Sequence, residues 1–487
     1  MRTHKLLSLS LIATGTALFA AILAACQAGT ETNGNPKVTL CTPDAPAAAP
    51  PKSAGPTGTF DKINHFVVIY LENHSFDNLY GEFPGAEGLT QAAKAAPQQD
   101  QSGTAYPVLP QPIDSTKSAP DPRFPATLPN APFNIDKYVQ PTDKTPDLVH
   151  RWYQEPLQIH GGKMDRFVAY SDSKGMVMGY WHTEQLPLAI EATNYTLCDH
   201  FFHAAFGGSF LNHQWLIAAA SPTFPNAPAS VIAQLDAKGN LVSDGFVTAK
   251  GCYVVNTAFT KNVPHPTGIA AEQYVPNQTN PTIGDRLSDK SITWAWYSGG
   301  WNDVVAGDAD AATKEQFQYH HQPFAYYAPY ADGTQGRKDH LKDETEFLDA
   351  AKAGTLPSVS FVKPVGNDNE HPGYASMAQG EAHVLTLINA VRSGPNWNDT
   401  AIIVTYDENG GQYDHVAPPT TDKNGPCSRV PAIVISPFAK KKFVDNTVYD
   451  TTSILATLEH RWGLDPLTSR DASVADLANA FDFGASP

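Results

Sequence analysis

Two adjacent carboxylates, Asp407 and Glu408, follow directly after the apolar run Ala401–Val404 and precede the glycine pair Gly410-Gly411. A short, β-branched apolar run bounded by glycine and proline predicts a buried strand of a parallel sheet. Ligands of open α/β sheets bind beyond the carboxyl ends of such strands, where buried carboxylates are unstable unless a cation neutralises them. The pattern predicts that Asp407 and Glu408 hold a metal ion. The alternative is an acidic turn that caps a helix or faces solvent.

A second apolar run, His65–Leu71, ends in the same way, with Glu72 and Asn73 directly after it. Both runs therefore place oxygen-bearing side chains where a strand ends. Oxygen ligands favour a hard divalent cation such as calcium, magnesium or manganese, and zinc is also compatible with them.

Ser209 follows two glycines and precedes an apolar helical run, so the pattern places it at the N-cap of a helix. One interpretation is a cap and nothing more. The other keeps the same geometry, because a hydroxyl beside free backbone N–H groups lies where a phosphate group binds. Three histidines, His320, His321 and His371, are expected on loops. They can belong to the same site only if the fold brings them close to the carboxylates.

The composition excludes some partners and leaves others open. The 487 residues suffice for one large α/β domain or two smaller ones, and they include 40 prolines and 17 histidines. The formal net charge of −16 argues against a nucleic-acid partner, which needs a basic face. An anionic substrate would have to be attracted by a local positive site.

The N-terminus has the features of an export signal. Arg2 and Lys5 precede the uncharged, mostly apolar segment Leu6–Leu23. The residues Leu23–Cys26 resemble the lipobox of bacterial lipoproteins, which implies a lipid anchor on Cys26. Alternatives are an ordinary cleavage site or an uncleaved anchor. We expect a signal peptide and lipobox at 1–26, a disordered tether at 27–60 and one catalytic domain at 61–487, in a protein that is exported and either anchored to the cell envelope or secreted.

Four cysteines remain once Cys26 is set aside: Cys41, Cys198, Cys252 and Cys427. An even number in an exported chain predicts disulfides, and three pairings are possible. The spacing of these cysteines does not match a zinc–thiolate motif.

Strand and helix patterns alternate along the chain, which predicts an α/β fold with a largely parallel central sheet flanked by helices. Residues 90–146 are rich in proline and show no periodicity, so we expect a long irregular surface loop there, lying over the site. Further strands are expected at Ile292–Tyr297, Val359–Val362 and Ala432–Ile435, and helices at Arg151–Gln158, Glu381–Arg392 and Ser453–Trp462.

Several motifs, taken together, resemble the bacterial phosphoesterase family. They are HFVVIYLENHSFDNLYGEFPG, DLVHRWYQEPLQIHGGKMD, FGGSFLNHQ, YHHQPF, NEHP and TYDENGGQYDHVAPP, in this order between about Asn64 and Leu464. That family contains non-specific phospholipases C and secreted acid phosphatases, and its core resembles that of the alkaline phosphatases.

The resemblance implies a role for each matching residue. Glu72, Asn73, Asp407 and Glu408 would bind a divalent metal, with Ser209 as the nucleophile touching it. His150, His320, His321 and His371 would line the phosphate pocket, whereas Asp414 and His415 match the motif but would only support the turn. His321 or His371 would protonate the leaving group, which would favour acidic pH.

The resemblance leaves the choice of substrate open. Phospholipase members typically carry extra C-terminal β-domains and a twin-arginine signal, whereas this sequence ends 79 residues after Glu408 and has no Arg-Arg near Met1. We therefore expect an acid phosphatase of broad specificity that acts through a phosphoserine. The alternatives are a phospholipase C and a catalytically inactive lipoprotein that binds phosphate or a partner. Apart from a phosphate-ester substrate and the anchor to the membrane, the sequence indicates no partner protein.

Overall fold

The computed structural model describes residues 60–114, 116–308 and 316–484. The expected signal peptide at 1–26, its Cys26, and the tether up to residue 59 lie outside the described residues. The export signal, the lipid anchor and the domain boundaries therefore stay predictions. Within the described ranges, no helix is both long enough and apolar enough to cross a lipid bilayer.

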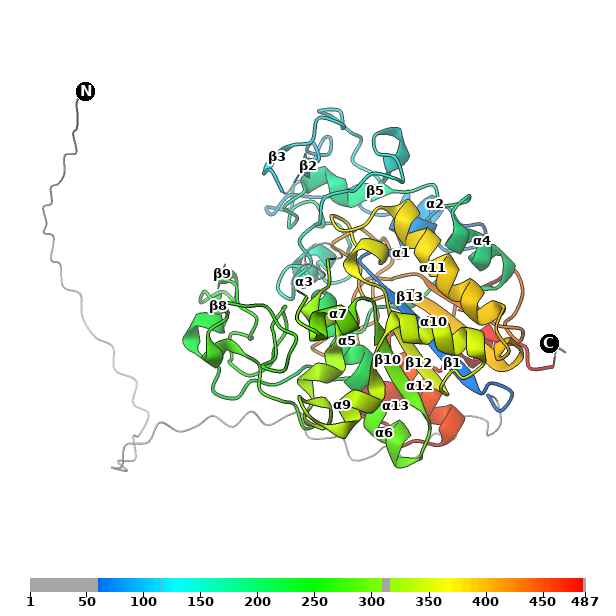
Figure 1. Cartoon of the computed structure of the whole chain (residues 1–487). Coiled ribbons are helices and arrows are strands. Elements are labelled where there is room, and N and C mark those ends of the chain that lie inside the picture. The colour runs from blue at the N-terminus through cyan, green and yellow to red at the C-terminus, as the bar shows by residue number, and fades with distance from the viewer. Residues whose placement is uncertain (1–59, 115, 309–315, 485–487) are drawn as a thin grey trace, which may run out of the picture. The chain divides into compact units, whose positions relative to one another are not determined.

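An eight-stranded sheet forms the centre of the fold (Figure 1). Its strands in spatial order are β11 (Leu341–Asp343), β10 (Trp294–Ser298), β12 (Val359–Lys363), β1 (His65–Leu71), β13 (Thr400–Tyr406), β14 (Ala432–Ile435), β6 (Thr196–Cys198) and β15 (Phe443–Asp445). All neighbours are parallel except β14, which is antiparallel to both β13 and β6. The predicted α/β fold with a largely parallel sheet is confirmed.

Helices flank the sheet in two groups. The first comprises α4 (Pro187–Asn194), α10 (Glu344–Ala353) and α11 (Met377–Arg392), and the last two lie in front of the strands in Figure 1. The second comprises α5 (Ser209–Ala218), α6 (Ile283–Asp289), α12 (Thr452–Trp462) and α13 (Ser469–Ser473). The central strands β1, β12 and β13 are almost entirely buried between them, as their continuous apolar runs require.

Shorter elements connect these layers. They are α1 (Phe76–Tyr80), α2 (Leu89–Ala92), α3 (Glu155–Ile159), α7 (Trp301–Val305), α9 (Gln335–His340), β2 (Ile113–Asp114), β3 (Ala119–Pro120), β4 (Phe133–Asn134), β5 (Gly179–Tyr180), β7 (Phe201–Phe202), β8 (Gln234–Leu235), β9 (Leu241–Ser243) and β16 (Tyr449–Asp450). The stretch 90–146 contains only such short elements, in agreement with the irregular loop expected there.

Two predicted helix boundaries are wrong. The helix expected at Arg151–Gln158 begins only at Glu155, because Pro156 lies in its first turn and proline favours a helix start. The helix expected to begin at Glu381 begins four residues earlier, at Met377, where the hydroxyl of Ser376 accepts a hydrogen bond from the backbone N–H of Gln379.

The cysteines do not form the two disulfides that their number suggested. Cys198 and Cys427 are free and buried, whereas Cys252 is disulfide-bonded. Cys198 ends β6 inside the sheet, where a thiol packs as a small apolar side chain. Both thiols are buried and unpaired, so the prediction of a disulfide from the even number of cysteines was wrong for Cys198 and Cys427.

A buried carboxyl on α12 gives a first prediction. Burial, together with the nearby carboxylate of Asp471, raises the pKa of Glu459 to about 10. The native state therefore holds a proton that the unfolded chain releases above its pKa of about 4.5, so the stability contributed by this group is lost as pH rises towards 10. Glu459→Gln should raise the free energy of unfolding by up to about 3 kcal/mol at pH 7 and by much less at pH 5.

Urea unfolding at the two pH values checks this expectation. Glu272→Gln, at an exposed position, is the matched control and should change stability by less than about 0.5 kcal/mol. A gain from Glu459→Gln that is equal at both pH values would show that the buried carboxyl is not the cause.

Candidate active site

The order of the strands brings three charged side chains together at the carboxyl ends of the central strands. β1 lies between β12 and β13, and its register pairs Ile69 with Val362 and Leu71 with Tyr406. Because these strands are parallel, Glu72, Lys363 and Asp407 meet at their carboxyl ends. The candidate site is thus made by chain segments about 290 and 335 residues apart.

Ser209 lies within reach of the oxygen-bearing side chains at this edge. Its Oγ is 2.9 Å from Glu72 Oε2, 3.4 Å from Asn73 Oδ1 and 3.5 Å from Glu408 Oε1. Asp407 completes the group, because its Oδ1 accepts a hydrogen bond from the backbone N–H of Asn73 at 3.2 Å. The structure therefore brings together all five residues that the sequence assigned to a metal.

The predicted N-cap role of Ser209 is wrong. α5 begins at Ser209 itself, and the capping position is held by Gly208 in an extended conformation. A side chain at Gly208 would collide with His150, since a Cβ there would lie 2.9 Å from His150 Cδ2. Only glycine fits this position, and the hydroxyl of Ser209 is directed to the carboxylates instead of the helix.

The side-chain amide of Asn73 tests whether these residues fit a cation. The amide atom placed as Asn73 Oδ1 lies 2.8 Å from Glu408 Oε1, 2.9 Å from Glu72 Oε2 and 3.2 Å from Asp407 Oδ1. With oxygen in that position, four oxygens converge, an arrangement that a cation would stabilise. With the amide rotated, its nitrogen donates to the carboxylates and its oxygen accepts from His371 Nε2. Among the described residues, Asp407 Oδ2 also has no hydrogen-bond partner. Such a converging oxygen set fits a hard divalent cation.

The electrostatics of the carboxylates point in the same direction. Burial raises the pKa of Asp407 well above its usual range, and the charges of Glu72 and Glu408 raise it further. Burial likewise raises the pKa of Glu408, to which Glu155 and Glu72 also contribute. The raised pKa values favour the protonated form of both carboxyls, whereas a bound cation would favour their ionised form.

His371 and His150 approach the group from one side. His371 Nε2 lies 2.9 Å from Asn73 Nδ2, and His150 Nε2 lies 3.4 Å from Glu408 Oε1. Burial lowers the pKa of His371 to about 4. Burial also acts to lower the pKa of His150, but Asp147 and the carbonyl of Leu148 outweigh it, so that this pKa is raised.

His320 and His321 lie in the 3-10 turn Tyr319–His321. His321 Nε2 is 3.1 Å from Glu72 Oε1. Burial lowers the pKa of His321 well below its usual value and that of His320 to about 4. His150, His321 and His371 therefore lie within 3.5 Å of side chains of the oxygen cluster. His320 packs against His321, with ring centroids 4.5 Å apart.

A cavity of about 460 Å³ opens onto Ser209. Its lining is polar except for Leu148, Val149, a glycine and the tyrosine ring: Thr116, Asp147, Leu148, Val149, His150, Arg151, Asp172, Gly208, Ser209, Asn256, Thr257, His371 and Tyr374. Thr116 belongs to the proline-rich stretch, so that stretch reaches the rim of the cavity. The nucleophile candidate thus lies at a solvent-connected pocket with charged walls.

Asp414 and His415 support the turn and do not reach the oxygen cluster. Buried Arg429 donates from Nε to Asp414 Oδ1 at 2.9 Å and from a terminal nitrogen to Asp77 Oδ1 at 3.1 Å. His415 Nδ1 lies 2.7 Å from Asp77 Oδ2. This network joins the segment after β13 to α1, which follows β1, and it fixes the two ligand-bearing segments relative to each other.

Two residues of the site were missed by the sequence analysis, Lys363 and His213. Lys363 forms an ion pair with Glu72 Oε1, and His213 Nδ1 lies 3.8 Å from Asp407 Oδ2. Signals for both existed. His213 lies four residues after Ser209 and therefore on the same face of the helix, and Lys363 ends an apolar strand.

The tight turn after the carboxylates gives a second prediction. Gly410 has φ +60°, and a Cβ there would lie 2.5 Å from the carbonyl oxygen of Asn73. Gly410→Ala should therefore displace Asn73, weaken metal binding at least about tenfold and cost more than about 2 kcal/mol of stability. Gly333, with φ +79° and open space around it, is the matched control. Gly333→Ala should show only the cost of the left-handed backbone, about 1–2 kcal/mol, with unchanged metal affinity.

Calorimetric metal titration and urea unfolding of both variants separate these effects. Equal losses in the two variants would mean that backbone strain alone is responsible and that the turn does not position Asn73.

Comparison with known proteins agrees with this geometry. The model of the phosphoesterase family matches residues 63–465, which include every residue of the candidate site. The chain belongs to the phosphoesterase family. The prediction of this family and of a phosphoric ester hydrolase is confirmed.

Bacterial phospholipases are among the curated relatives of this phosphoesterase. Phospholipase C A of Mycobacterium tuberculosis is 25% identical over 492 residues, covering 91% of this chain and 82% of the relative. Non-hemolytic phospholipase C of Pseudomonas aeruginosa is 27% identical over 474 residues, covering 88% of this chain and 58% of the relative.

Solved structures are more distant from this phosphoesterase. A protein of the alkaline phosphatase superfamily from Vibrio parahaemolyticus shares 11% identity and a TM-score of 0.33, over 62% of this chain and 65% of that one. A TM-score this low supports no inference about the site.

Proposed function

We propose that this phosphoesterase hydrolyses water-soluble phosphate monoesters with the help of one divalent cation and through a phosphoserine on Ser209. The observation that carries the proposal is the position of Ser209 Oγ in the lining of the cavity, 2.9 Å from Glu72 Oε2 and beside Asn73 and Glu408. A bound divalent cation would lower the pKa of the serine hydroxyl and neutralise phosphate charge. Glu72, Asn73, Asp407 and Glu408 would hold this cation, whose identity among calcium, magnesium, manganese and zinc is open.

The side chains around Ser209 supply the remaining steps. Ser209 Oγ attacks phosphorus, and the bond to the leaving alcohol breaks as the phosphoserine forms. The histidines beside Ser209 would contact the phosphoryl oxygens, whose charge must be stabilised during transfer. Water then releases phosphate and restores the hydroxyl.

His150 is our candidate for the proton donor to the leaving group, in place of His321 or His371. Its pKa is raised, whereas burial lowers the pKa of both other imidazoles. Its Nδ1–H donates to the carbonyl of Leu148, and Nε2 is turned towards Glu408. Because the donor must be protonated, activity should fall as pH rises through the pKa of His150, which lies above the usual imidazole value.

A monoester is favoured over a lipid by the lining of the cavity. A diacylglycerol leaving group needs an apolar surface, and the described lining offers only two aliphatic side chains, Leu148 and Val149. The second candidate is phospholipase C activity, which the names of the curated relatives favour.

One assay separates these functions. Turnover of p-nitrophenyl phosphate is compared with turnover of p-nitrophenyl phosphorylcholine, from acidic to weakly alkaline pH, with the full chain supplied with each of the four cations. Faster monoester turnover supports the phosphatase, and a preference for the diester overturns it in favour of a phospholipase C. Turnover of neither substrate leaves a protein that only binds phosphate or a partner.

A further inference from the structure

Lys363 is a buried cation inside the candidate metal site. It ends β12 with only 1% of its side chain exposed, and its Nζ forms an ion pair with Glu72 Oε1. The same nitrogen donates a hydrogen bond to the carbonyl oxygen of Tyr70 at 3.1 Å. One oxygen of Glu72 therefore faces Ser209 and the cation ligands, while the other is held by an ammonium group.

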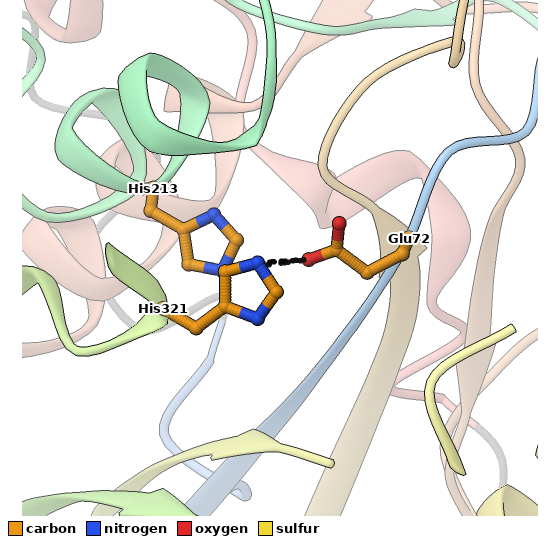
Figure 2. Close-up of side chains that lie close together, drawn as sticks. All are labelled: Glu72, His213 and His321. Carbon is orange, nitrogen blue, oxygen red and sulfur yellow. Dashed lines mark ion pairs between the residues drawn. The ribbon is translucent and has the colours of Figure 1, made fainter. Parts of the chain in front are cut away.

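Two imidazole nitrogens face the oxygen that Lys363 holds. His321 Nε2 lies 3.1 Å and His213 Nε2 3.9 Å from Glu72 Oε1, and the two rings are stacked with their centroids 4.8 Å apart (Figure 2). Neither Nε2 has a hydrogen-bond partner among the described residues, although both are buried. His213 Nδ1 lies 2.7 Å from the carbonyl oxygen of Ser209, so this nitrogen carries the proton and Nε2 presents its lone pair to Glu72.

One carboxylate and two imidazoles are a ligand set that binds divalent metals. Glu72, His213 and His321 have the required atoms within 4.8 Å of one another. A cation placed there would share Glu72 with the cation beside Ser209 and would form a bridged pair. Lys363 already supplies a positive charge at this position.

The charges of the buried groups decide between one cation and two. Glu72, Asp407 and Glu408 contribute three negative charges, which one divalent cation and the Lys363 ammonium balance. A second divalent cation would add two positive charges that these three carboxylates do not balance, which is unfavourable in a buried site.

We propose that Lys363 takes the place of a second metal ion, and that it blocks a latent metal site made by Glu72, His213 and His321. The proposal rests on the proposed function, because it requires the first cation beside Ser209. Lys363 is thus a positioning residue that sets the number of metal ions to one.

The number of manganese ions per chain tests this proposal. Manganese is chosen because it prefers oxygen ligands to the buried thiols elsewhere in the chain. The full chain is stripped with a chelator, equilibrated with Mn²⁺ and separated from unbound metal before metal analysis. We expect one ion in the wild type, two in Lys363→Met and one in Lys363→Arg, which keeps the charge. The double variant Lys363→Met/His213→Gln should return to one.

Electron paramagnetic resonance gives a second readout that does not depend on activity. A single Mn²⁺ gives a resolved hyperfine pattern, whereas two ions bridged by Glu72 give a spin-coupled signal, expected only in Lys363→Met. Two ions in the wild type, or one ion in a folded Lys363→Met, would overturn the role of Lys363 while leaving the first site intact. If Lys363→Met does not fold, a wild-type count of two ions would still overturn the proposal. A wild type that binds no manganese at all would overturn the proposed site and this inference together.

Discussion

Replacing Ser209 with alanine should lower monoester turnover by at least about 10³-fold while leaving the fold intact, because the proposed nucleophile is lost and no other hydroxyl replaces it. The fold should survive since the Ser209 side chain does not cap α5, and the hydrogen bonds lost are those to Glu72, Asn73 and Glu408. Stopped turnover of a ³²P-labelled monoester should leave acid-stable label on the wild type at Ser209 and none on the variant.

Ser360→Ala is the matched control for this prediction. Ser360 is a buried serine on β12 whose hydroxyl has no hydrogen-bond partner among the described residues, so its loss should leave turnover within about twofold. If Ser209→Ala keeps more than about a tenth of the wild-type turnover, water is the attacking group and no phosphoserine forms. The cation ligands could still be correct in that case.

The strands and the ligands at their ends could be predicted from local sequence because their signals are local. The apolar run His65–Leu71 has the same bounds as β1, and Ala432–Ile435 the same bounds as β14. In a parallel sheet the carboxyl ends of strands share an edge, so two oxygen-bearing segments that end apolar runs were expected to meet.

The order of the strands could not be predicted in this way, because it depends on packing between segments hundreds of residues apart. That order places β12 beside β1 and so brings Lys363 to Glu72. No local pattern marks a lysine after a strand as an internal counter-ion, since most such lysines lie at the surface.

Boundaries failed where one residue overrode a regular pattern. Gly208 replaced Ser209 as the cap because His150 packs against it, and Pro156 delayed the start of α3. The free thiols of Cys198 and Cys427 are a failure of another kind, since counting cysteines says nothing about which of them the core will bury.

Replacing Asp407 with asparagine should raise the stability of the metal-free protein and lower the stability of the metal-bound protein. Asp407 Oδ2 has no hydrogen-bond partner among the described residues, and burial raises the pKa of this carboxyl. Without metal, the neutral amide avoids burying a charge, so at pH 8 the chelated variant should be more stable than the chelated wild type.

With metal present, the wild type should be more stable than Asp407→Asn. A cation at 100 times its Kd stabilises the wild type by about 2.7 kcal/mol, whereas a variant with 100-fold weaker binding gains only about 0.4 kcal/mol. Urea unfolding in chelator and in Mn²⁺ measures both differences, and turnover should fall along with metal affinity. Asp445→Asn is the control, because this buried carboxylate lies on β15, three strands from β13, where it accepts a hydrogen bond from the Tyr449 hydroxyl at 2.8 Å. It should lose the same stability with and without metal. If Asp407→Asn behaves like this control, the buried carboxylates of Asp407 and Glu408 are structural and the cation beside Ser209 must be held by other residues.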